Sequence, residues 1–253
     1  DEAHNIEKVA LQYLGVSLNY YRIRRILNRL YSPNEHRYGL FAMLRKWAEE
    51  VVKGWPEFAD NVPIIEAAVE SVQYVRSVTR ELFECLYSAV LSEAEDVKNR
   101  SDGKLRYDEN IIVFSNCAEI IEAFNGAVSS LIQAIDDIKM LVSGISSGRL
   151  NDKEEILIDL EKSQVDIQGI INDFDFLIEA LGRNVFWFEF VENGNSYSLK
   201  VLSAPLDIAE KLAVGLYDHM ETVIMTSATL TVARDFTYLR ERLGLNLDSR
   251  ERV

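Results

Sequence analysis

The sequence predicts a mainly α-helical protein, built on an antiparallel helical bundle and completed by a β-hairpin and smaller α/β pieces. Three observations support this fold class. Apolar residues recur every three or four positions over three long segments, which is the spacing of one helix face. Turns interrupt these segments, as expected for neighbours in an antiparallel bundle. Alternating apolar residues then surround Asn193-Gly194, a favoured two-residue hairpin turn.

The composition is that of a soluble globular chain, since 48% of its 253 residues are hydrophobic. The chain contains no apolar run of about eighteen residues, and no cationic segment followed by an apolar stretch at its start. We therefore expect neither a membrane span nor a signal peptide, and we expect a cytoplasmic protein. Because the first residue is Asp1 rather than methionine, we interpret the chain as a fragment or a processed product.

The net charge of −14 is unevenly distributed. Residues 1–55 carry nine Lys and Arg against six Asp and Glu, whereas residues 56–181 carry ten against twenty-five. A module that coats nucleic acid is expected to be basic, because neutralising phosphates drives such binding. The acidic middle therefore excludes that class, and any contact with DNA must be local.

Four helices are expected before residue 97, and turn or helix-breaking residues separate them. They cover residues 3–14, 17–30, 38–53 and a long segment from Pro63 to about Asp96. The apolar positions of the long segment step by three and four throughout, so this helix should pack against neighbours.

The second of these helices carries the most basic stretch of the chain. Arg22, Arg25 and Arg29 recur at intervals of three and four and so share one face. Tyrosines alternate with these arginines, and such a face could follow a phosphodiester backbone and stack bases. The alternative is a solvent-exposed face that forms salt bridges with the acidic middle.

The middle of the chain continues the helical pattern after a charged stretch from Lys98 to Asp108, which predicts a loop or hairpin tip. Two capping pairs mark the starts of the next helices, which run to Val142 and Leu181: Asn116 with Glu119, and Asn151 with Glu154. The apolar stripes could also serve a dimeric coiled coil. The intervening turns favour packing within one chain, so we expect a monomer.

From Gly182 the pattern changes from helical to alternating. Residues 185–191 and 197–202 predict the two strands of the hairpin, and a helix is expected from Pro205 to about Asp218. Residues 222–226 predict a short buried strand, and residues 236–244 a closing helix. That strand would deliver Ser227 and Thr229 to its carboxyl end, where open α/β sheets bind ligands.

The chain has two cysteines, Cys85 and Cys117. A structural zinc ion or an iron–sulfur cluster needs about four ligands, so we interpret both residues as plain thiols. The fragment is therefore expected to carry no iron–sulfur cluster.

The chain begins with adjacent carboxylates in Asp1-Glu2-Ala3-His4. If Asp1 ends a buried strand, its carboxylate can hold a magnesium ion, while Glu2 is placed to orient or deprotonate an attacking water. Four residues alone are a weak signal, and surface charge is the alternative interpretation of an acidic pair at a chain end.

Three segments together resemble the DinG branch of the XPD/DinG helicases of superfamily 2. They are Asp1 to Asn5, then Ala204 to Asp207 followed by Val223 to Thr231, and finally Phe236 to Leu245. The resemblance implies two RecA-like domains that bind ATP and magnesium between them, with a helical arch domain inserted into the first. It also implies a 5′-to-3′ DNA helicase that couples ATP hydrolysis to single-strand translocation and duplex unwinding.

By this resemblance, residues 1–35 belong to the first motor domain, residues 36–182 form the arch, and residues 183–253 contain the hairpin and the return into the motor. Asp1 would ligate magnesium and Glu2 would activate water. His4 would link the ATP site to the hydroxyls of Ser227 and Thr229. The basic residues Arg22, Arg25 and Arg29 would guide single-stranded DNA.

The 253 residues depart from the family pattern in three ways. They contain no glycine-rich phosphate loop with its lysine, no four-cysteine iron–sulfur segment and no second motor domain with an arginine finger. We therefore expect the chain alone neither to hydrolyse ATP nor to unwind DNA, and we expect the remaining motor segments and single-stranded DNA as partners in the full-length protein. The alternative function is a non-catalytic acidic bundle that docks a partner protein.

Overall fold

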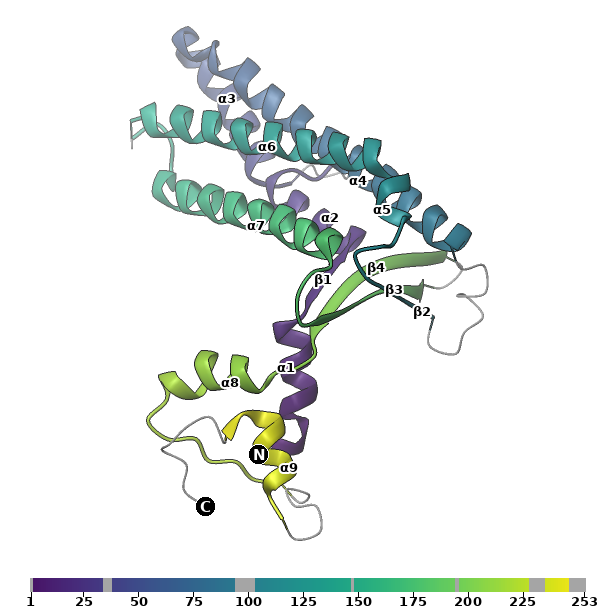
Figure 1. Ribbon diagram of the computed structural model, residues 1–253. Coiled ribbons are helices and arrows are strands. Elements are labelled where there is room, and N and C mark those ends of the chain that lie inside the picture. The colour runs from purple at the N-terminus through teal and green to yellow at the C-terminus, as the bar shows by residue number, and fades with distance from the viewer. Residues whose placement is uncertain are drawn as a thin grey trace.

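The computed structural model describes residues 2–33, 38–93, 103–146, 148–193, 196–227 and 235–245. Within these ranges the protein is mainly helical, with one small four-stranded antiparallel sheet (Figure 1). The long helices form a bundle, the sheet lies at one end of the bundle, and the helices nearest the two chain ends lie beyond the sheet. The prediction of a mainly helical protein that also contains a β-hairpin is confirmed.

Three long helices make up most of the bundle: α4 (Asn61–Glu93), α6 (Ala118–Gly144) and α7 (Lys153–Glu179). Successive helices run in opposite directions (Figure 1), and α6 contacts both α4 and α7. Two shorter helices complete the packing: α2 (Tyr20–Leu30) contacts α4 and α7, and α3 (Leu40–Gly54) contacts α4. The predicted apolar stripes are buried between these helices, with Leu86, Leu131 and Phe174 each fully enclosed.

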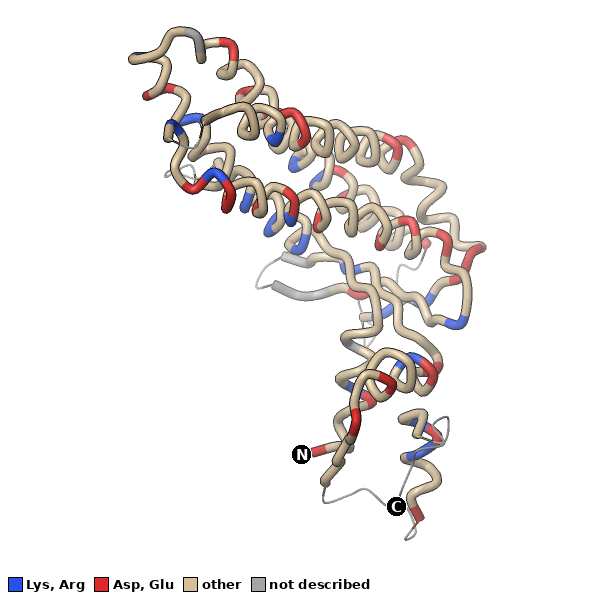
Figure 2. Tube along the Cα trace, turned by 90° about the vertical axis from the view of Figure 1, so that its left-hand side faces the viewer, with Lys and Arg blue, Asp and Glu red and all other residues tan. Residues whose placement is uncertain are grey.

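Charge is distributed unevenly over the bundle. Figure 2 shows acidic positions along the bundle and a short row of basic positions on one helix. Helix α2 carries four arginines. It packs against α7, which carries acidic residues along its length. Opposite charges are therefore brought together at the contact between α2 and α7.

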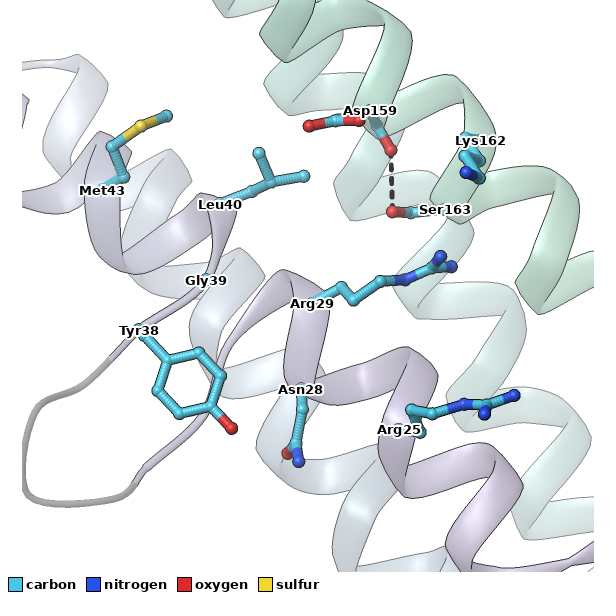
Figure 3. Close-up of a pocket in the computed structure, with 10 residues that line it drawn as sticks. All are labelled: Arg25, Asn28, Arg29, Tyr38, Gly39, Leu40, Met43, Asp159, Lys162 and Ser163. Atoms are coloured by element: carbon cyan, nitrogen blue, oxygen red, sulfur yellow. Dashed lines mark hydrogen bonds between the residues drawn. The ribbon is translucent and has the colours of Figure 1, made fainter.

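A cavity of about 630 Å³ opens between α2, α3 and α7 (Figure 3). Three basic side chains and one carboxylate line it, together with polar and apolar residues: Arg25, Asn28, Arg29, Tyr38, Gly39, Leu40, Met43, Asp159, Lys162 and Ser163.

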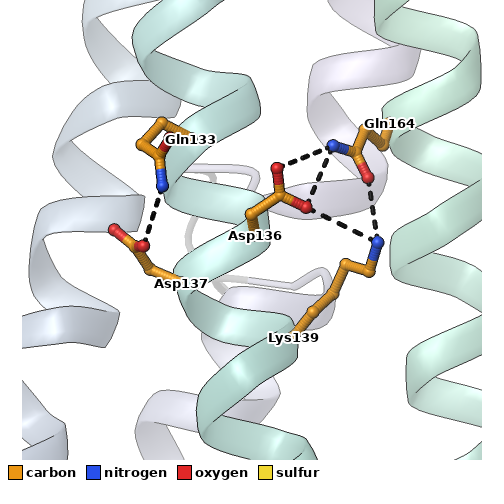
Figure 4. A network of polar contacts seen from close by, with 5 residues as sticks. All are labelled: Gln133, Asp136, Asp137, Lys139 and Gln164. Atoms are coloured by element: carbon orange, nitrogen blue, oxygen red, sulfur yellow. Dashed lines mark hydrogen bonds and ion pairs between the residues drawn. The ribbon is translucent and has the colours of Figure 1, made fainter.

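A polar network joins α6 to α7 (Figure 4). Gln164 donates from Nε2 to both carboxylate oxygens of Asp136 at 3.1 Å, and its Oε1 accepts a hydrogen bond of 3.1 Å from Lys139. Gln164 interrupts the apolar stripe of α7, and these partners satisfy its amide. A shift between the helices would leave the amide without them, so the network favours this register.

The sheet has the strand order β1-β4-β3-β2, with β1 at Val16–Asn19, β4 at Ser196–Pro205, β3 at Asn184–Asn193 and β2 at Lys104–Tyr107. The predicted hairpin is confirmed, with Asn193 paired to Ser196. The turn residues Gly194 and Asn195 lie outside the described ranges. The sheet shares its hydrophobic core with the bundle. Its buried residues in that core include Phe186, Phe188 and Val201.

The sequence prediction is wrong for the two edge strands. The segment from Ser17, expected to begin a helix, pairs with β4 instead, and α2 begins only after Asn19, whose side chain accepts a hydrogen bond of 2.8 Å from the Arg22 amide. The segment Lys104–Tyr107, expected to be part of a loop or hairpin tip, pairs with β3 as a strand. Both strands are four residues long, so their identity depends on a distant partner rather than on a local pattern.

Both predicted capping pairs are also wrong. Asn116 ends the short helix α5 (Val113–Asn116), and α6 begins after Cys117 without a side-chain cap. Likewise, α7 begins after Asp152 rather than Asn151, again without such a cap. Burial of Phe114 and Cys117 draws the chain into the core just before α6, so packing overrides the local preference for a polar cap.

The last part of the chain contains α8 (Ala209–Gly215), the 3₁₀ turn η4 (Tyr217–His219) and α9 (Thr237–Leu243). The helix expected from Pro205 starts later, because Pro205 is the last residue of β4, opposite Asn184. The closing helix is confirmed. Among the residues placed by the structure, no helix is both long and apolar enough to cross a membrane.

Candidate functional site

Residues near the start of the chain meet residues 226 and 227 through two contacts. The backbone N–H of Ala3 donates to the carbonyl of Thr226 at 2.9 Å. Next to it, Nδ1 of His4 lies 2.7 Å from Oγ of Ser227, a residue 223 positions later in the sequence. The structure therefore brings together His4 and Ser227, which belong to the two predicted motifs.

Glu2 completes this group of side chains. Its Oε2 lies 3.1 Å from Nδ1 of His4. A carboxylate can only accept, so this contact favours a proton on Nδ1 of His4. The backbone of Glu2 is left-handed, with φ of 56°, a conformation that costs a non-glycine residue about 1–2 kcal/mol. Strained residues of this kind gather at functional sites.

The group is open to solvent. The side chain of Glu2 is 64% exposed and that of His4 is 44% exposed, so water screens their attraction and it adds little to stability. Both contacts use the same ring nitrogen, so Nδ1 of His4 joins the carboxylate of Glu2 to the hydroxyl of Ser227.

Two predicted site residues, Asp1 and Thr229, lie outside the described residues, and their roles remain predictions. In the described ranges no group of three or more His, Cys, Asp or Glu side chains could hold a metal ion. Magnesium takes about six ligands, mostly oxygens, whereas this group offers the single carboxylate of Glu2. The described residues do not by themselves form a magnesium–ATP site.

A small hydrophobic cluster, distinct from the main core, holds the two chain segments together. Ala10 of α1 (Ile6–Leu14) packs with Ile208, which precedes α8, and with buried residues of α8, η4 and α9: Leu212, Ala213, Tyr217 and Leu243. Met225, which directly precedes Thr226, packs against the same cluster. The position of Ser227 relative to His4 is thus supported by apolar packing as well as by the backbone hydrogen bond.

An ion pair and a glycine strengthen this junction. Arg242 of α9 donates to Glu7 of α1, and this hydrogen bond raises the pKa of Arg242. Gly244 ends α9 with φ of 74°, and a Cβ there would lie 2.1 Å from the carbonyl oxygen of Ala209. The sequence pattern predicts a helix end at Gly244, but it does not predict the ion pair, because residues so far apart in sequence leave no local pattern.

The prediction of a strand at residues 222–226 is wrong. This segment has no strand partner among the described residues, and two of its apolar side chains are exposed, Val223 by 39% and Ile224 by 82%. A strand exists only beside a hydrogen-bonded neighbour, which apolar composition alone cannot supply.

The three arginines of the predicted DNA-binding face have different surroundings. Arg22 lies 2.6 Å from a carboxylate oxygen of Asp173, and Arg29 pairs with Asp166, both on α7. These contacts are those of the salt-bridged alternative. Arg25 faces the cavity of Figure 3 and forms no hydrogen bond or ion pair with the described part of the chain. DNA binding by the three residues remains a prediction.

Comparison with known proteins gives a distant similarity. No family model matches the chain. The chain is 23% identical over 251 residues to a protein of Bacillus subtilis (strain 168) named 3′-5′ exonuclease DinG, and the match covers 97% of this chain and 26% of that protein. The chain thus spans about a quarter of the length of this relative. The similarity supports a relationship to DinG, and so to an enzyme that acts on nucleic acid.

Proposed function

We propose that this chain is part of a DinG-like, ATP-dependent DNA helicase that couples ATP hydrolysis to single-strand translocation and duplex unwinding. The observation that carries the proposal is the 2.7 Å contact between His4 and Ser227. These residues belong to two motifs that resemble the same helicase family, and chance would not be expected to place them together. The similarity to DinG along 97% of the chain agrees with this proposal.

In this proposal residues 36–182 are the arch, and residues 1–35 and 183–253 belong to the first motor domain. Long antiparallel helices suit an arch that stands away from a motor. The exposed apolar residues Val223 and Ile224 suit a surface that other segments of the motor cover. The remaining motor segments are therefore the first partners of this chain, and single-stranded DNA is the second.

The residues of the chain then connect hydrolysis to movement. By the family resemblance, Asp1 would hold magnesium, which would neutralise charge on the phosphates of ATP, and Glu2 would orient the attacking water. His4 would connect Glu2 to the hydroxyl of Ser227, and Thr229 would supply a second hydroxyl. A change at the phosphates would thereby reach the segment around Ser227 and be coupled to translocation in the 5′-to-3′ direction.

Phosphate release and nuclease assays on the 253-residue chain test this assignment. We expect no ATP turnover above background with or without a single-stranded oligonucleotide, because the chain has no phosphate loop. Any turnover that disappears in a Glu2→Gln variant would overturn the expectation of an inactive fragment. Degradation of the oligonucleotide by the chain would instead support an exonuclease activity and contradict the helicase assignment.

A further inference from the structure

A group of basic side chains lies where α2 packs against α4 and α7. We name it the α2 basic face, and it consists of Arg24, Arg25, Arg76, Arg80 and Lys162. Arg76 connects its members: it donates to Asn28 at 2.9 Å, and Asn28 lines the same cavity as Arg25 and Lys162 (Figure 3). Arg24 and Arg80 lie near enough to Arg76 to act on its charge.

Carboxylates do not balance the charge of this face. Arg24, Arg25, Arg80 and Lys162 form no hydrogen bond or ion pair within the residues that the structure places, and the described bonds of Arg76 go to the neutral acceptors Asn28 and Tyr31. Burial lowers the pKa of Arg76, and the positive charges of Arg24 and Arg80 lower it further, whereas Tyr20 and Tyr38 act in the opposite direction. Asp159 is the carboxylate that lines the cavity. The net charge of the protein is −14, so this cluster of cations is a local exception, and its positive potential attracts an anionic ligand.

Aromatic rings border the same face. Tyr20 and Tyr21 form an edge-to-face pair with ring centroids 5.7 Å apart. Tyr21 and Tyr38 are each 49% exposed, and Tyr38 stands beside Asn28 at the cavity (Figure 3). Exposed rings among cations suit a ligand that carries both phosphates and flat bases. The cavity volume of about 630 Å³ is in the range of small-molecule sites, so one nucleotide unit can enter it.

We propose that the α2 basic face binds single-stranded nucleic acid, with phosphates at Arg24, Arg25, Arg80 and Lys162 and bases against Tyr21 and Tyr38. This inference rests on the proposed function and refines it. The strand contact moves from Arg22 and Arg29, which α7 neutralises, to neighbouring cations that lack acidic partners.

Fluorescence anisotropy with a labelled oligothymidylate, titrated with the full 253-residue chain at several salt concentrations, tests the proposal. The variant Arg24→Glu/Arg25→Glu/Arg80→Glu should bind at least tenfold more weakly at about 0.1 M salt. Its salt slope should fall by about 2, since each lost phosphate contact removes about 0.7 for a single strand. The matched control Lys8→Glu/Lys53→Glu/Lys211→Glu changes the net charge equally at exposed positions elsewhere and should change affinity less than twofold. Equal weakening by both variants, or no binding by the wild-type chain, would overturn the proposal.

The tyrosines separate nucleic acid from an acidic protein as the ligand. Tyr21→Ala and Tyr38→Ala should each weaken oligothymidylate binding roughly 5- to 160-fold, the effect of losing one stacked base. Tyr13→Ala, at a residue of α1 that is 84% exposed, should leave affinity unchanged. If polyglutamate competes as well as oligothymidylate and the tyrosine variants bind normally, the face binds acidic protein and the proposal is wrong.

Circular dichroism melts confirm that each variant is folded before its affinity is interpreted. Failure of this inference can also be distinguished from failure of the proposed function. A longer protein that contains this chain and hydrolyses ATP, while the α2 basic face contributes nothing to binding, would refute this inference alone. Binding at the face without any ATP hydrolysis by such a protein would refute the helicase assignment alone.

Discussion

Nδ1 of His4 and Oγ of Ser227 lie 2.7 Å apart, and the Ala3 amide donates to the Thr226 carbonyl beside them. If the two contacts support each other, removal of the Ser227 hydroxyl will loosen the backbone hydrogen bond. We predict that Ser227→Ala accelerates hydrogen exchange of the Ala3 amide about two- to twelvefold, which corresponds to a hydrogen bond worth about 0.5–1.5 kcal/mol.

The same experiment with His4→Ala should give a similar acceleration, and the double variant should exchange no faster than the faster single variant. His219→Ala removes an exposed histidine of η4 and serves as the control, with no change expected at Ala3. Additive effects of His4→Ala and Ser227→Ala would show that the two side chains do not act together.

Two buried tyrosines differ in whether the hydroxyl forms a hydrogen bond, so they measure what such a bond contributes to stability. Tyr107 donates to the carbonyl of Leu177 at 2.8 Å, whereas the hydroxyl of Tyr217 has no partner among the described residues. Tyr107→Phe should lower the free energy of unfolding by about 1 kcal/mol, and Tyr217→Phe should leave it unchanged or raise it by up to about 1 kcal/mol. Urea unfolding measures both, and an equal loss in the two variants would contradict this account.

The bundle could be predicted from sequence because its signal is local. The apolar stripes of α4, α6 and α7 are complete within each helix, so spacing alone identified them. The strands β1 and β2 could not be predicted, since four residues become an edge strand only when β4 or β3 lies beside them. The predicted strand at residues 222–226 failed for the converse reason, because apolar composition provides no neighbour.

The candidate site divides in the same way. The motifs identified His4 and Ser227, and the structure placed them together. The pair of Glu7 with Arg242 and the association of Arg24, Arg76 and Arg80 depend on how separate helices are packed, which no spacing within one helix reveals. Asp166 and Asp173 likewise became the partners of α2 only through the packing of α7.

Gly15 was predicted as a helix stop, but the structure gives a second reason for glycine at this position. It follows α1, as expected of a helix stop, but its φ is −83° and requires no glycine. A Cβ there would lie 2.4 Å from the carbonyl oxygen of Ser203 in β4, so the missing side chain permits close approach of the two backbones. Gly15→Ala should therefore destabilise the protein by about 2 kcal/mol or more.

Gly126 is the control for this substitution. It lies within α6, and a Cβ at Gly126 would meet nothing within 4 Å. Gly126→Ala should raise the free energy of unfolding by about 0.5–1 kcal/mol, because alanine loses less backbone freedom on folding. Thermal or urea unfolding of both variants checks the pair, and a neutral Gly15→Ala would contradict the close approach.

Alkaline pH should weaken the fold through buried thiol and phenol groups, among them Cys117 and Tyr217. Burial, and then the neighbouring Cys85, raise the pKa of Cys117 from 9.0 to about 12, and burial raises the pKa of Tyr217 from 10.0 to about 12. The folded state favours the protonated form of both groups. Their contribution is therefore complete below about pH 9 and is lost as the pH rises through 12.

Between pH 9 and 10 Cys117 should dominate this loss, since an unfolded thiol ionises before an unfolded phenol. The free energy of unfolding should fall by up to about 1.4 kcal/mol per pH unit from this residue. Cys117→Ala should flatten the dependence in that range, as measured by urea unfolding at each pH. An unchanged slope in the variant would exclude Cys117 as the source.

Unwinding of a 5′-tailed duplex by a longer protein that contains this chain tests the central claim most directly. The wild-type protein should unwind the duplex in the presence of ATP, and Ser227→Ala should reduce the unwinding rate at least tenfold while ATP still binds. Ser77→Ala, at an exposed position of α4, should unwind at the wild-type rate. If the wild-type protein does not unwind the duplex, or if Ser227→Ala unwinds it as fast as wild type, the proposed coupling through His4 and Ser227 is wrong.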